Sequence, residues 1–164
     1  MKKTVSFFLS FVLLLSAVFC VPGFSASAAV YKPDRKLYSQ AYMLLSLDDP
    51  SFPVVAEKNQ DKRMYPASLT KIVTTMVVLN KVKDLSQKTK VSQSAYDAVL
   101  GTGAQTAGLK VGESLTIEQL LYLTMVHSAC DACQVLAEFV SGSTDAFVAE
   151  MNSWVQSLGC KSTH

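Results

Sequence analysis

Two side chains that could carry out acyl transfer stand three residues apart in the stretch Tyr65-Pro66-Ala67-Ser68-Leu69-Thr70-Lys71. A serine hydroxyl becomes a useful nucleophile when a neighbouring base accepts its proton, and an uncharged lysine amine can be that base. At this spacing on a helix, two side chains lie on the same face and can approach within hydrogen-bond distance. We therefore expect Ser68 to be a nucleophile and Lys71 to be its general base.

The helix that would position this pair is predicted by the residues around it. Pro66 is tolerated just before a helix, and the apolar residues from Ile72 to Val82 recur with a helical period. The positive helix N-terminus and burial beside an apolar helix would both favour the uncharged amine that a base requires. Residue chemistry alone leaves a second interpretation equally open, in which Ser68 caps the helix and Lys71 is a solvated side chain of its first turn.

Residues 1–28 have the three parts of a secretory signal peptide. A basic start, Met1-Lys2-Lys3-Thr4, precedes an apolar run from Val5 to Val21, and Ala26-Ser27-Ala28 provides a small-x-small cleavage pattern. We expect cleavage before Ala29 and export to the cell envelope, outside the cytoplasm. No stable membrane anchor beyond this peptide is expected, and an uncleaved anchor is the less favoured alternative.

The charge balance and the cysteines exclude some classes of protein. The 164 residues include 15 basic and 13 acidic ones, and removing the signal peptide with Lys2 and Lys3 leaves 13 of each sign. Without a basic stripe or a patch interleaved with aromatic residues, a nucleic-acid partner is not expected. Three cysteines would remain after cleavage, and an odd number argues against a complete disulfide framework.

The rest of the chain predicts two strands followed by a block of helices. Residues 29–40 are a polar leader, and residues 41–164 form one partial domain. Ala41–Leu47 and Pro53–Glu57 indicate a strand, a turn and a second strand. After the Ser68 helix we predict no further strand, because residues 83–91 have the composition of a polar connection.

Three further helices and a short one are predicted from capping signals and apolar periodicity. The short helix runs from Ser92 or Gln93 to Leu100. Thr116 and Gln119 form a capping box for a helix that reaches His127, and a break follows at Ser128-Ala129. The next helix is predicted to begin with Asp131 as its N-cap and to end at Gly142. The last helix is predicted to run from about Asp145 to Leu158. Its buried side would carry Phe147, Val148, Met151, Trp154, Val155 and Leu158.

An ordered series of short motifs resembles a known family. The motifs are Ala-Tyr-Met-Leu at residues 41–44, Glu57-Lys58-Asn59, the Ser68 stretch, Gly108-Leu109-Lys110-Val111-Gly112-Glu113, Leu115 to Leu121 and Ala146 to Asn152. Together they resemble the low-molecular-weight penicillin-binding proteins of the D-alanyl-D-alanine carboxypeptidase type. The resemblance implies an α/β fold of the α+β type, β-lactamase/transpeptidase-like and truncated, with two N-terminal antiparallel strands, a helical block and the late strands missing.

The resemblance also implies a reaction and a site. The enzyme would be a serine-type D-Ala-D-Ala carboxypeptidase acting on peptidoglycan stem peptides that end in D-Ala-D-Ala, with β-lactams as covalent inhibitors and no cofactor. Ser68 would be acylated, Lys71 would be the general base, and Ser128 would transfer protons. Cys130 stands at the position of the family's substrate-binding asparagine. A thiol is a weak hydrogen-bonding group, so it cannot replace both ends of an amide.

Two departures from the family pattern keep other functions open. Cys130 replaces the asparagine, and the family's third motif, Lys-Thr-Gly on a late strand, does not occur. A non-catalytic fragment or pseudoenzyme that binds cell-wall peptide or penicillin is therefore the main alternative, and a serine β-lactamase is a further one. We expect no metal at His127, Cys130 and Cys133 and no redox pair of cysteines, and we expect Cys160 to fill a core position.

Overall fold

The structure is a computed structural model that describes residues 34–48, 51 and 53–164. These residues form two compact units, which meet in the sequence between Lys62 and Arg63. The predicted signal peptide and the first residues of the predicted leader lie outside the described residues. The boundaries of the predicted domain, residues 41–164, stay a prediction.

The first unit contains an antiparallel hairpin made of β1 (Tyr42–Leu45) and β2 (Val54–Lys58). Tyr42 lies opposite Lys58, and the pairing shifts by one residue between Leu44 and Leu45. The Lys58 ammonium donates to the Ser39 carbonyl at 2.9 Å. This hydrogen bond connects the residues before β1 to the end of β2. The two predicted strands are confirmed, and most of the turn predicted between them lies outside the described residues.

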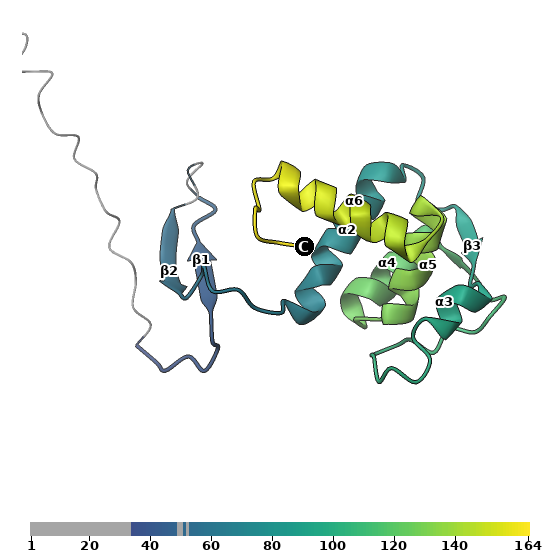
Figure 1. Ribbon diagram of the computed structural model, residues 1–164, viewed down its shortest axis with the longest axis horizontal. Helices are drawn as coiled ribbons and strands as arrows, with labels where there is room; N and C mark the ends of the chain where they lie inside the picture. Colours follow the sequence, from purple (N-terminus) through teal and green to yellow (C-terminus); the bar gives the residue numbers. More distant parts are fainter. Residues whose placement is uncertain (1–33, 49–50, 52) are drawn as a thin grey trace, which may run out of the picture. The chain divides into compact units, whose positions relative to one another are not determined.

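The second unit is a group of helices arranged around α5, as Figure 1 shows. In chain order they are η1 (Ala67–Leu69), α2 (Thr70–Lys81), α3 (Gln93–Asp97), α4 (Ile117–Val126), α5 (Cys130–Ser141) and α6 (Thr144–Ser157). Helix α5 packs against each of the four other α-helices. Val78, Ile117, Leu120 and Leu136 are fully buried at the centre. The apolar core therefore sits around α5, with α2 and α4 packed against it.

A second, smaller sheet corrects the prediction that no strand follows the Ser68 helix. Strand β3 (Lys88–Lys90) pairs antiparallel with β4 (Ser114–Thr116). The ladder is extended by bonds from the Val91 amide to the Glu113 carbonyl and from the Ile117 amide to the Gln87 carbonyl, both 2.9 Å long. Each strand has three residues, and the sequence Lys-Thr-Lys shows no apolar alternation. Pairing with a distant segment makes β3 a strand, and local composition does not predict that.

The ends of α4 and α5 test the capping signals that were predicted from the sequence. Both halves of the capping box are formed: the Thr116 hydroxyl accepts from the Gln119 amide, and the Gln119 side chain accepts from the Thr116 amide. Gly142 ends α5 with φ +78°, in the left-handed region that favours glycine. These local predictions are confirmed because each involves residues that are close in sequence.

Two burial predictions at the C-terminal helix are wrong. Val148 and Leu158, which we placed on the buried side of α6, are 45% and 61% exposed. Cys160, which we placed in the core, is exposed and follows the end of the helix. Only part of the predicted face of α6, centred on Phe147 and Val155, contacts other helices closely enough to be buried.

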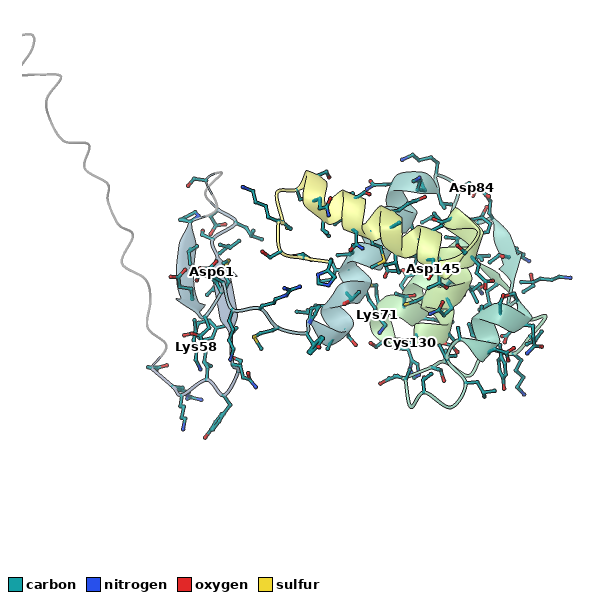
Figure 2. The ribbon with its side chains drawn as sticks, viewed as in Figure 1. Lys58, Asp61, Lys71, Asp84, Cys130 and Asp145 are labelled. Carbon is teal, nitrogen blue, oxygen red and sulfur yellow. The ribbon has the colours of Figure 1, made fainter. Side chains whose placement is uncertain are left out.

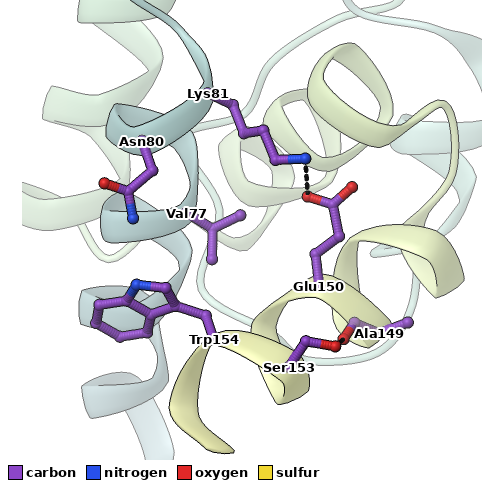
Figure 3. A pocket seen from close by; sticks show the side chains of 7 residues that line it. All are labelled: Val77, Asn80, Lys81, Ala149, Glu150, Ser153 and Trp154. Atoms are coloured by element: carbon purple, nitrogen blue, oxygen red, sulfur yellow. Dashed lines mark hydrogen bonds and ion pairs between the residues drawn. The ribbon is translucent and has the colours of Figure 1, made fainter. Parts of the chain in front are cut away.

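A hollow of about 330 Å³ lies between α2 and α6 (Figure 3). Val77 and Trp154 provide apolar surface, and the Lys81 ammonium reaches the Glu150 carboxylate at 3.1 Å across it. None of the four predicted site residues lines this hollow. No helix in the part of the chain that the structure describes is long and apolar enough to cross a membrane.

Candidate active site

Ser68 and Lys71 lie at the entrance to α2. Ser68 is the middle residue of the η1 turn, and Lys71 is the second residue of α2. The Lys71 Nζ atom lies 3.5 Å from Ser68 Oγ, so the two side chains share one face as their spacing predicts. Ser68 is exposed and Lys71 is half-buried. This distance is longer than an ordinary hydrogen bond, which is usual for reacting pairs without a bound substrate.

The turn between α4 and α5 brings a second hydroxyl to the same place. Ser128 Oγ donates a 2.9 Å hydrogen bond to Ser68 Oγ. Ser128 itself has φ +58°, the left-handed conformation that costs a residue with a side chain about 1–2 kcal/mol. Ala67, directly before Ser68, is also left-handed, with φ +50°. Backbone strain thus occurs on both segments that supply a hydroxyl.

Cys130 completes a cluster of the four predicted site residues. It is the first residue of α5, and its Sγ atom lies 3.5 Å from Lys71 Nζ. Figure 2 shows the Lys71 and Cys130 side chains next to one another. The lysine nitrogen therefore has an oxygen and a sulfur at the same distance, and the sulfur is the weaker hydrogen-bonding partner.

Asp131 does not cap α5, and that prediction is wrong. The N-cap is Ala129, which makes no side-chain cap, and Asp131 is the second residue of the helix. The residue is 3% exposed, and its carboxylate accepts from the amides of Ala107 and Leu109, each at 3.0 Å. The signal that could have shown this is the spacing of four between Asp131 and the core residue Val135, which puts the carboxylate on the buried face.

Cys133 lies one turn further along α5 and is half-buried. Its thiol donates to the Ala129 carbonyl at 3.2 Å, and burial raises the pKa of this thiol. A thiol that keeps its proton is a poor nucleophile. Within residues 34–48, 51 and 53–164, the structure has no group of three or more His, Cys, Asp or Glu side chains that could hold a metal ion.

The structure brings together all four residues that the sequence singled out. Ser128, Ser68 and Lys71 form a continuous chain of polar atoms, with separations of 2.9 and 3.5 Å. Such a chain can move a proton away from the Ser68 hydroxyl and return one to a leaving group. The positive end of α2 beside Ser68 would also favour negative charge that develops there.

A family profile and the most similar curated relatives all point to one protein family. The profile of the D-alanyl-D-alanine carboxypeptidase family, Peptidase_S11, matches residues 26–164. The chain is 37% identical over 132 residues to the D-alanyl-D-alanine carboxypeptidase DacA of Escherichia coli K12, covering 77% of this chain and 32% of the relative. It is 33% identical over 144 residues to DacF of Bacillus subtilis 168, covering 84% and 36%. The chain thus spans about a third of the length of these curated relatives.

Solved structures show the same likeness in three dimensions. The Streptomyces K15 DD-transpeptidase superposes with a TM-score of 0.72 at 30% identity, over 82% of this chain and 53% of that one. Penicillin binding protein 5 of Haemophilus influenzae gives 0.70 at 29% identity, over 82% and 39%. The predicted fold class, α/β and transpeptidase-like, is confirmed, with the small β3–β4 sheet added to it.

Proposed function

Because this chain belongs to the D-alanyl-D-alanine carboxypeptidase family, we propose that it acts as a serine-type acyl transferase on peptidoglycan stem peptides ending in D-Ala-D-Ala. Ser68 is the nucleophile, Lys71 the general base and Ser128 the group that passes protons. β-Lactams are covalent inhibitors that acylate the same serine. The observation that carries the proposal is the convergence of Ser68, Lys71 and Ser128 from two separate segments of the chain.

The proposed reaction has two steps. Ser68 Oγ attacks the carbonyl carbon between the two D-alanines while Lys71 accepts the hydroxyl proton. The C–N bond then breaks, and Ser128 passes the proton held by Lys71 to the departing amine of the last D-alanine, which leaves Lys71 uncharged again and Ser128 protonated. The acyl group is now an ester on Ser68. Lys71 accepts a proton from the attacking water and returns it to Ser68 Oγ as the ester bond breaks, which releases the acyl group and restores the serine.

The side chain at residue 130 affects the expected rate of acylation. The family places an asparagine at the Cys130 position, where its amide can hold both the lysine and the substrate, and a thiol holds them weakly. We therefore expect acylation to be slower with Cys130 than with an asparagine at the same position.

Labelling with a fluorescent penicillin tests the proposal. The purified chain should gain one adduct, and peptide mass spectrometry should place it on Ser68. A Ser68→Ala chain should not be labelled, whereas Ser157→Ala, which changes an exposed serine on α6, should be labelled at the parental rate. A full-length relative serves as the positive control. If that relative is labelled and this chain is not, the chain is a non-catalytic protein.

We also propose that the protein is exported and acts at the cell envelope. The support is the three-part pattern of residues 1–28, which lie outside the described residues, and the carboxypeptidase family to which the chain belongs. Expression in a bacterial host followed by N-terminal sequencing should find a chain that begins at Ala29 outside the cytoplasm. An uncleaved chain retained in the cytoplasm would contradict export.

A further inference from the structure

The turn that carries Ser128 is hydrogen-bonded to residues 105–109, which we call the clamp segment. The Cys130 amide donates to the Gln105 carbonyl at 2.8 Å, and the Gln105 side-chain amide donates to the His127 carbonyl at 2.8 Å. The ring of His127 bonds the Thr106 carbonyl at 3.1 Å. Hydrogen bonds from the clamp segment therefore reach the chain both before and after Ser128.

The buried carboxylate of Asp131 anchors the other end of the clamp segment. One oxygen accepts from the Ala107 amide and the other from the Leu109 amide. Gly108, between them, has φ +76°, a conformation that favours glycine. The Ala132 amide, in the first turn of α5, also donates to the carboxylate at 2.9 Å. Three backbone amides and the positive end of the helix thus stabilise the carboxylate of a buried residue.

Ser128 needs such support because of its own backbone. A left-handed serine is less stable than an extended or helical one, so it persists only where its surroundings enforce it. If the clamp segment moved away, the Ser128 backbone could relax to a commoner conformation. Its hydroxyl would then turn away from Ser68, although neither serine contacts Asp131.

We propose that Asp131 is a positioning residue for the reaction: by holding the clamp segment against the start of α5, it keeps the Ser128 hydroxyl within hydrogen-bond distance of Ser68. The proposal rests on the proposed function for its consequence in catalysis. Its structural half, the control of the Ser128 backbone by Asp131, can be measured whether or not the chain is an enzyme.

The variant that tests this is Asp131→Asn. It keeps the shape of the side chain and replaces one accepting oxygen by an NH₂ group, which cannot accept from the Ala107 or Leu109 amide. Glu138→Gln is a matched control on the same helix. That carboxylate also accepts two hydrogen bonds from a distant segment, in this case from the Ser92 and Ser94 hydroxyls, but it does not contact the clamp segment.

The first measurement is nuclear magnetic resonance of the folded chains, with global stability measured in parallel. In Asp131→Asn the Cys130 amide should exchange with solvent at least about tenfold faster, and the carbon shifts of Ser128 should lose their left-handed values. Glu138→Gln should change neither. If Ser128 and Cys130 in Asp131→Asn match the unsubstituted chain, the proposal is overturned. If Asp131→Asn does not fold, Asp131→Glu is measured in its place: it keeps the charge, but its extra methylene moves the carboxylate from its position against the Ala107 and Leu109 amides, so the same changes at Ser128 and Cys130 are expected, and their absence overturns the proposal.

The second measurement is the rate of acylation by saturating penicillin, in a double-mutant cycle with Ser128→Ala. Asp131→Asn should slow acylation about tenfold in the parent and less than about twofold when Ser128 is already alanine, because its effect acts through that hydroxyl. Equal slowing in both backgrounds would mean a general structural role and overturn the proposal. Absence of acylation in the parent would overturn the proposed function instead, and the resonance measurement then decides the role of Asp131.

Discussion

Ser68 and Lys71 reach one another across one turn of helix, whereas Ser128 reaches Ser68 from 60 residues away. The first contact depends on helical spacing at the start of α2. The second depends on a left-handed turn, the clamp segment and a buried carboxylate. The same cluster therefore joins a locally determined pair to a partner that is positioned by tertiary structure.

This difference matters because the two regions should respond differently to substitution. Changes on α2 remove a chemical group and leave the backbone in place, because the helix persists without any one exposed side chain. Changes around the α4–α5 turn can move Ser128 while leaving every reacting group present. Three substitutions test this contrast.

The largest effect is expected for Lys71→Ala. Removing the general base should slow acylation of Ser68 by about 10³-fold, while the free energy of unfolding changes little, because Lys71 is only half-buried. Stopped-flow labelling with fluorescent penicillin measures the rate. Lys81→Ala, at the other end of the same helix, is the control and should label at the parental rate. If Lys71→Ala is labelled within threefold of the parental rate, Lys71 is not the base for Ser68. The contrast between the local Ser68–Lys71 pair and the distant Ser128 would then not hold.

An intermediate effect, and an increase, is expected for Cys130→Asn. An amide at the start of α5 can both accept from Lys71 and donate to a substrate carbonyl, so acylation should speed up by about tenfold. The same labelling assay measures it, and Cys160→Asn at an exposed thiol is the control. Unchanged or slower acylation would show that the position of the turn, more than the type of side chain at residue 130, limits the site.

The smallest effect on the site is expected for Thr116→Ala, at the opposite end of α4 from the turn. Loss of the capping box should lower the free energy of unfolding by about 1 kcal/mol, measured by urea denaturation, with acylation of the folded chain unchanged. Ser153→Ala, at an exposed position within α6, should change stability by less than about 0.5 kcal/mol. Slower acylation in folded Thr116→Ala would mean that the turn is coupled to the start of α4.

The contacts predicted correctly share one property, which is that their signals are local. The closeness of the Ser68 and Lys71 side chains, the Thr116–Gln119 capping box and the Gly142 end of α5 each involve residues within one helical turn. The Tyr42–Lys58 hairpin was also predicted, because its two strands adjoin in the sequence. The β3–β4 sheet was missed because each strand is short and becomes a strand only by pairing with the other.

The sequence by itself determined that Ser68 and Lys71 lie together at the start of one helix, because helical geometry relates neighbours without reference to the rest of the chain. The family motifs added Ser128 and Cys130 as candidates. Only the tertiary structure decided that the Ser128 hydroxyl lies 2.9 Å from Ser68, and that Asp131 binds the backbone of residues 107 and 109 in place of capping α5. Those contacts join segments far apart in the sequence, so they depend on how the helices pack around α5, which no local pattern records.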